Sequence, residues 1–176
     1  MKLSKRLETM YACPEAVKWI GKRGAMTAWR DCNRADWMLW AAGKFGIDQK
    51  LIVLCACDIA ETVLKYVPEG EDRPAKAIQT SRNWCNGTAT KRECRAAAYA
   101  ADAAAYAAAA ADAAAYAAYA AAAAAYAAYA AAAAYAAAAA NAAAYADADA
   151  KKAHAGIVRK RIPYELIKQA IKDHQQ

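Results

Sequence analysis

The chain has 176 residues, which is enough for one domain with a substantial hydrophobic core and short for two. Alanine makes up much of its 60% hydrophobic content, so the 5 Trp and 11 Tyr must supply much of the packing volume. The N-terminal segment is charged throughout and lacks the apolar stretch of a signal peptide. No run of 18 strongly apolar residues follows, so the sequence predicts a cytoplasmic protein rather than a secreted or membrane protein.

The net charge of +7 is unevenly distributed along the chain. Residues 1–95 hold 17 Lys and Arg against 11 Asp and Glu, residues 96–150 hold none against 4, and residues 151–176 hold 7 against 2. We therefore expect a single domain over residues 1–176 with a Trp- and Cys-rich helical part, an Ala/Tyr helical array and basic C-terminal helices. Anionic partners fit this charge, although a solvated helix face is its commoner cause.

Six cysteines raise the question of disulfides or a metal site. In a non-secreted chain they are expected to be reduced thiols that pack as small apolar groups. No paired Cys-x-x-Cys motifs occur, and only His154 and His174 are available as further ligands, so the sequence predicts neither a metal nor a cofactor. The cysteines are Cys13, Cys32, Cys55, Cys57, Cys85 and Cys94.

The first half of the chain contains several helix signals. Pro14 suits a first helical turn and predicts a short helix over Glu15–Gly21. A second, heavily aromatic helix is expected from Thr27 to Gly46. Asp48 is expected to cap a third helix, which the pattern continues to Val67, just before a proline.

The next signals predict a fourth and a fifth helix. Asp72 is expected to cap a helix over Arg73–Cys85, which the Asn-Gly pair at 86–87 closes. Thr90 and Glu93 have the spacing of a capping box and open the following helix. No strand or hairpin signal competes with these helices.

The Ala/Tyr array has no proline or glycine between Thr88 and Ala155, and alanine has the highest helix propensity. One helix of that length would extend roughly 100 Å, whereas a compact chain of this size has a radius of gyration of about 16 Å. We therefore expect the array to fold back into two or three closely packed helices. Asp102, Asp112 and Asn141 are the candidate break points.

The tyrosines of the array recur every ten residues, as at Tyr106, Tyr116 and Tyr126. Such a repeat winds around a straight helix, so it predicts neither one coiled-coil seam nor a flat ice-binding face. Pro163 then separates the last helix, whose apolar face is expected to contain Leu166, Ile167 and Ile171. Together these elements predict an all-α, compact bundle of about six to eight helices.

The segment NRADWMLW is the most distinctive stretch outside the array. Asp36 lies among aromatic residues and needs a partner, which Arg30 or Arg34 can supply with two hydrogen bonds. One interpretation is a structural ion pair. The other is the polar floor of a ligand pocket with Trp37 and Trp40 as walls.

The charged turn PEGEDRP offers a second candidate site. Its carboxylates lack a second positioned catalytic group, so acid–base chemistry is not predicted there. Capping of the next helix explains Asp72, and the functional interpretation is binding through Arg73 and Lys76. The basic C-terminal segment has the charge but not the motif of a nucleic-acid-binding protein.

These segments together resemble the immunity-protein family of bacterial polymorphic toxin systems, which phages also carry. The similarity lies in WRDCNRADWMLW, in CACDIAETVLKYVPEGEDRPAKAIQTSRNW, in the Ala/Tyr array and in IVRKRIP, and it covers roughly residues 13–163. It implies an all-α, non-catalytic immunity or counter-defence protein of the bacterial cytoplasm that neutralises an antagonist by binding it.

Two binding mechanisms stay open at this point. The helical surface can cap a protein toxin, or an aromatic and basic pocket, possible also between subunits of a homo-oligomer, can sequester a small anionic, nucleotide-derived signal. The alternative is a structural or interaction protein without a small ligand; a membrane partner is not expected. The expected binding residues are Arg34, Asp36, Trp37, Trp40, Glu71, Arg73, Lys76, Arg82, Trp84, Tyr99 and Tyr106.

Overall fold

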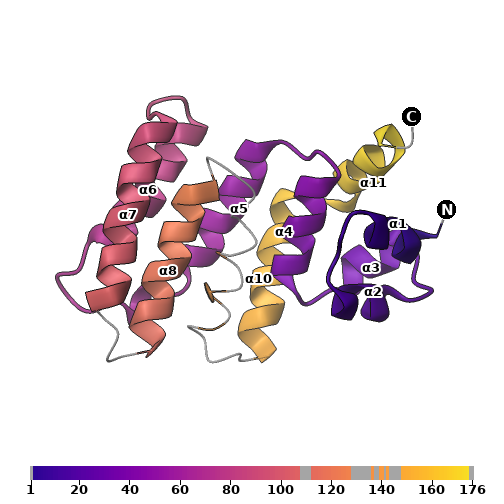
Figure 1. Cartoon of the computed structure of the whole chain (residues 1–176), viewed down its shortest axis with the longest axis horizontal. Coiled ribbons are helices and arrows are strands. Elements are labelled where there is room, and N and C mark those ends of the chain that lie inside the picture. The colour runs from indigo at the N-terminus through magenta and orange to yellow at the C-terminus, as the bar shows by residue number, and fades with distance from the viewer. Residues whose placement is uncertain are drawn as a thin grey trace.

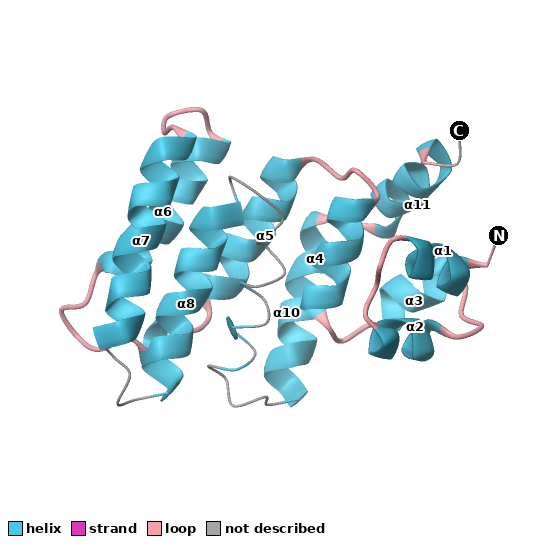
Figure 2. Cartoon of the chain, in the orientation of Figure 1, coloured by secondary structure: helices cyan, strands magenta, loops and turns pink. Residues whose placement is uncertain are grey.

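The computed structural model describes residues 2–107, 112–127 and 148–174, together with residues 136, 139, 140 and 142. These residues form α-helices, one short 3-10 helix and connecting loops, with no strand among them (Figure 2). The predicted all-α class is confirmed. The described residues contain ten α-helices, above the expected six to eight, because the charged N-terminus forms a helix and one predicted helix is divided into two.

The helices form a row in which each packs against its neighbours (Figure 1). α7 and α6 stand at one end, α8 and α5 follow, then α10 and α4, and the other end holds α1, α2, α3, α11 and both termini. In chain order the elements are α1 (Leu3–Thr9), α2 (Pro14–Ile20), α3 (Ala25–Asp31), α4 (Ala35–Lys44), α5 (Gln49–Glu61), the 3-10 helix η1 (Leu64–Tyr66), α6 (Arg73–Cys85), α7 (Lys91–Ala107), α8 (Asp112–Ala127), α10 (Ala148–Arg161) and α11 (Tyr164–Asp173).

The single helix predicted from Thr27 to Gly46 is wrong, because the backbone is extended at Cys32 and Arg34 between α3 and α4. A contact from the far end of the chain satisfies the backbone there: the Arg159 guanidinium of α10 donates to the Cys32 carbonyl at 2.7 Å. A carbonyl held by a side chain in this way does not need a helical partner. The break between α3 and α4 is therefore a tertiary feature.

The third predicted helix also ends early, since α5 stops at Glu61 and η1 takes up part of the remainder. At the stop, the Thr62 hydroxyl donates to the Ile59 carbonyl at 2.7 Å and lies 2.9 Å from His154 Nε2 of α10. A threonine that bonds the preceding turn competes with helix propagation. The start of α5 follows the prediction, because the Asp48 carboxylate accepts from the Lys50 amide at 2.6 Å.

Of the N-terminal caps predicted for α6 and α7, the first is wrong and the second is confirmed. Asp72 makes no side-chain cap for α6; instead the Glu71 carboxylate accepts from the Arg73 amide at 3.0 Å. The capping box before α7 is confirmed, since Thr90 Oγ1 accepts from the Glu93 amide at 3.2 Å and the Glu93 carboxylate accepts from the Thr90 amide at 2.7 Å.

The Ala/Tyr array folds back as expected: α7 and α8 pack directly against each other. α8 also contacts α5, α6 and η1, so alanines on several of its sides are completely buried. Among the candidate break points, α8 begins at Asp112 and Asp102 lies within α7, while Asn141 is outside the described residues. Small side chains let these helices approach closely.

The basic C-terminal segment divides at Pro163 as predicted, but the apolar face of α11 is narrower than expected. Ile167 is buried, whereas Leu166 is 41% exposed, because adjacent residues of a helix point about 100° apart. None of the described helices is both long and apolar enough to cross a bilayer.

Five of the six cysteines are buried as free thiols, in agreement with their predicted role as small apolar groups, and Cys13 is exposed. Burial raises the pKa of the Cys55 thiol and of the Cys57 thiol to about 12. Both side chains therefore stay protonated and pack as apolar groups in the core.

The buried His154 predicts a pH dependence of stability. Burial lowers its pKa below the ordinary value of 6.5, so the unfolded chain binds a proton that the folded chain does not once the pH falls through that value. As the pH falls below the ordinary histidine pKa of about 6.5, we expect this group to decrease the wild-type free energy of unfolding by up to about 1.4 kcal/mol per pH unit. Urea denaturation of wild type and His154→Gln measures the difference.

His174→Gln is the matched control, because His174 is exposed at the C-cap of α11. This variant should retain the wild-type pH dependence, whereas His154→Gln should flatten it. Equal slopes in all three proteins would show that His154 does not supply the effect.

Candidate functional site

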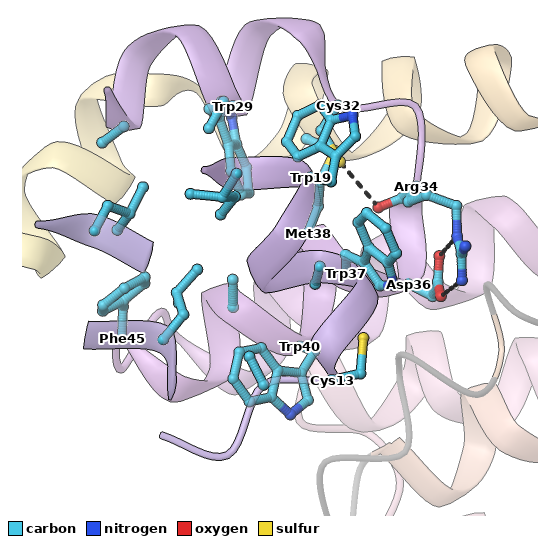
Figure 3. A pocket seen from close by; sticks show the side chains of 18 of the residues that line it. Cys13, Trp19, Trp29, Cys32, Arg34, Asp36, Trp37, Met38, Trp40 and Phe45 are labelled. Atoms are coloured by element: carbon cyan, nitrogen blue, oxygen red, sulfur yellow. Dashed lines mark hydrogen bonds and ion pairs between the residues drawn. The ribbon is translucent and has the colours of Figure 1, made fainter. Parts of the chain in front are cut away.

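A cavity of about 480 Å³, seen from close by in Figure 3, is lined by residues of α1 to α4 and α11. These helices stand at the end of the molecule that contains both termini (Figure 1). Its wall includes four of the five tryptophans: Trp19 from α2, Trp29 from α3, and Trp37 and Trp40 from α4. Most of the other lining side chains are also apolar, and they come from α1 to α4, from the loop before α2 and from α11. A concave, largely apolar surface with few polar groups is the usual form of a binding site.

The tryptophans of the wall are held in place by their own contacts. Trp29 is 7% exposed, and its indole Nε1 donates to the Ile162 carbonyl at 3.1 Å. The rings of Trp19 and Trp37 are 6.1 Å apart between centroids and tilted by 59°. A tilted pair at this separation is a favourable aromatic contact. The cavity is therefore walled by side chains that already occupy defined positions.

The charged residues of the wall are Glu15 and the Arg34–Asp36 pair, which lies beside Trp37 in Figure 3. Arg34 Nε lies 2.9 Å from Asp36 Oδ1, and Arg34 Nη2 lies 2.7 Å from Asp36 Oδ2. The predicted two-bond pair thus forms with Arg34, while Arg30 pairs with Asp31. The hydrogen bonds to Asp36 raise the pKa of the Arg34 guanidinium, whose carbon lies 4.4 Å from the Trp37 ring centroid.

The structure separates the predicted binding residues into two groups. Arg34, Asp36, Trp37 and Trp40 line the cavity. The others lie around α6 and α7, at the opposite end of the row of helices (Figure 1). They are Glu71, Arg73, Lys76, Arg82 and Trp84, with Tyr99 on α7; Tyr106 also belongs to α7, and its side chain is outside the described residues.

The charged residues of the α6 group are already engaged in ion pairs. The Arg73 guanidinium beside Glu71 lowers the pKa of that carboxyl to about 2. Arg82 Nη2 lies 2.7 Å from the Glu61 carboxylate and 3.0 Å from Asp58, which also pairs with Arg161. This cluster connects α5, α6 and α10. Its geometry accounts for these residues as contacts between helices.

Several lining residues were not predicted as site residues. Trp19 was visible only as part of a short helix, and Phe45, Leu7 and Ile171 reach the cavity from three different elements. Arg6 of α1 fixes this arrangement, since its guanidinium donates to the Ile171 carbonyl at 3.0 Å and lies 5.1 Å from the Phe45 ring centroid. No local sequence pattern connects residues so distant from one another. The high tryptophan content of the first 45 residues was the one available sign that they could form an aromatic site.

The chemistry of the wall favours binding. Cys32 lines the cavity, but burial raises the pKa of its thiol, which disfavours the nucleophilic thiolate. Within the described residues, no three side chains of His, Cys, Asp or Glu are grouped as metal ligands would be. A cavity with aromatic walls and one ion pair between its own residues can bind an apolar group of a ligand and hold it in a defined position.

Comparison with known proteins gives one family. The model described as "Imm-5 like putative immunity protein" matches residues 46–164. No curated protein and no solved structure matches the chain significantly. The matched segment begins after Phe45 and ends before Ile167, so the segment WRDCNRADWMLW and every lining residue of the cavity lie outside it. The family match therefore covers α5 to α10, while the cavity is built from the two ends of the chain.

Proposed function

The chain belongs to the Imm-5 like family of immunity proteins, and from this premise we propose that it neutralises a protein toxin by stoichiometric, non-catalytic binding. The aromatic cavity is the proposed binding site, and it takes an apolar side chain of the toxin. The observation that carries the proposal is the composition of its wall: four tryptophans and mostly apolar neighbours, with the one lining arginine paired to Asp36. Buried aromatic anchors dominate the energetics of protein interfaces.

The surface around the cavity supports a protein partner. Tyr11 lines the cavity and is 91% exposed, with a left-handed backbone at φ 63° that a non-glycine residue rarely adopts. Met26 on α3 and Leu166 on α11 are also exposed, at 57% and 41%. Each is directly next to a lining residue on its helix, Ala25 and Ile167 respectively. Exposed apolar side chains beside a pocket are typical of an interaction surface rather than of an enclosed small-molecule site.

Sequestration of a small anionic signal is the alternative, and the cavity gives it less support. A phosphate enclosed in the cavity needs a lining cation that is free to pair with it, and Arg34 is the one Lys or Arg side chain among the described lining residues. The Arg34 guanidinium already donates to both carboxylate oxygens of Asp36. Glu15 adds a second carboxylate to the lining. Arg73 and Arg82 are likewise paired, at the other end of the molecule.

Growth of bacteria that express a candidate polymorphic toxin, with and without this chain, tests the proposal. Co-expression of the chain should restore growth, and the purified pair should form a complex of fixed stoichiometry. A panel of nucleotide signals should leave the melting temperature unchanged. A shift of several degrees with one nucleotide, lost in Trp37→Ala, would instead favour sequestration.

A further inference from the structure

Three of the four tryptophans of the cavity carry a cation over the ring. Arg23 lies 4.8 Å from the Trp19 centroid, and Arg34 lies 4.4 Å from that of Trp37. The Lys44 ammonium lies 5.7 Å from the Trp40 centroid. Each cation is within the range of a cation–π contact, so positive charge is held directly beside the apolar walls.

Two of these cations form no salt bridge with a carboxylate among the described residues, although beside the hydrogen bond from Arg30 the nearby charge of Arg23 also helps to lower the pKa of the Asp31 carboxyl. Arg34 pairs with Asp36, but Arg23 donates only to the Trp19 carbonyl, and Lys44 forms no ion pair there. Both side chains are exposed. Their charge is therefore available to a partner that sits on the cavity, at a site where a carboxylate would reach them without displacing an existing pair.

The surroundings have the same sign. Residues 1–45 contain 9 Lys and Arg against 4 Asp and Glu, and α11 contains two of each. Two of the four carboxylates, Asp31 and Asp36, are already paired with arginines. The end of the molecule that contains the cavity thus has a strong excess of positive charge, which disfavours a second copy of this chain as the occupant.

From this charge arrangement we infer that the toxin segment bound at the cavity is acidic: one aromatic or branched apolar side chain enters the cavity, and carboxylates on either side of it pair with Arg23 and Lys44. The inference rests on the proposed function and adds the chemistry of the partner. The apolar contact limits dissociation, while the charges accelerate association and select against basic segments.

Short capped peptides test this chemistry without knowledge of the toxin. Each has a central Phe, and the flanking residues are all Glu, all Gln or all Lys. Their binding is followed through the indole N–H signals of the tryptophans in a ¹⁵N-labelled protein. We expect the Glu peptide to shift the signals of Trp19, Trp37 and Trp40 and to bind about tenfold more tightly than the Lys peptide at low salt, with a smaller ratio at high salt.

A pair of double variants separates local charge from net charge. Arg23→Gln/Lys44→Gln should reduce the preference for the Glu peptide to about twofold or less, since the cations over the Trp19 and Trp40 rings are gone. Lys91→Gln/Arg92→Gln removes the same charge on α7, including a lysine 5.8 Å from the ring of Trp84, and should retain the preference. Loss of the preference in both variants would overturn the assignment to Arg23 and Lys44.

The other outcomes are distinct. If all three peptides shift the cavity signals equally, or the Lys peptide binds best, the acidic partner is wrong and the cavity remains as the binding site. If no peptide shifts them, or the peptides bind equally well to the cavity-filling variant Ala41→Leu, both the inference and the proposed site fail. Shifts caused only by free nucleotides would indicate a small anion instead and would overturn both.

Discussion

Trp37→Ala is expected to abolish protection against the toxin and to weaken the complex by about 100-fold, the loss typical of a tryptophan at the centre of an interface. The ring forms one wall of the cavity, contacts Trp19 and lies beneath the Arg34 guanidinium. Its removal takes away contact area for the toxin. It also removes the ring contact to Trp19 and the cation–π contact to Arg34, which hold these side chains in position. Calorimetric titration of the purified proteins measures the change, alongside the growth assay.

Two further variants distinguish loss of the site from loss of the fold. Trp84→Ala removes a tryptophan that is also partly buried and lies near a lysine, but at the α6 end of the molecule, so it should leave the affinity near wild type. Ala41→Leu keeps all four tryptophans of the wall but enlarges a lining side chain and so fills the cavity, and it should weaken binding as Trp37→Ala does. Full protection by Trp37→Ala, with the fold verified by circular dichroism, would exclude the cavity as the binding site.

Ala121→Leu is expected to lower the free energy of unfolding by about 1–3 kcal/mol, although leucine is more apolar than alanine. Ala121 is completely buried in α8, which packs against α5, α6 and α7. The extra methyl groups have no space there, so they force the helices apart or push side chains into unfavourable rotamers. The alanines of this helix are thus required by the close approach of its neighbours.

Ala103→Leu provides the comparison, because Ala103 is exposed on α7 and helix propensity changes little between alanine and leucine. Urea denaturation should show a stability within about 0.5 kcal/mol of wild type for this variant. If Ala121→Leu is as stable as Ala103→Leu, the interior of the array is loosely packed and its alanines are not selected for size.

The sequence by itself determined which segments are helical wherever a local signal marks the helix end. Pro14 opens α2, the Asn-Gly pair closes α6, and the Thr90–Glu93 box opens α7, because each of these residues acts on its own turn of backbone. The fold-back of the array followed from its length. The Arg34–Asp36 pair was also predictable, since its members are two residues apart.

Tertiary structure alone decided the helix breaks and the site. α3 ends where Arg159, 127 residues away, donates to a carbonyl, and α5 ends where Thr62 meets His154. The cavity brings residues of α1 to α4 together with α11 and leaves Arg73, Arg82 and Trp84 on the far side of α5. Residue spacing specifies neighbours within about one helical turn, whereas packing between distant elements depends on the shapes of all the faces at once.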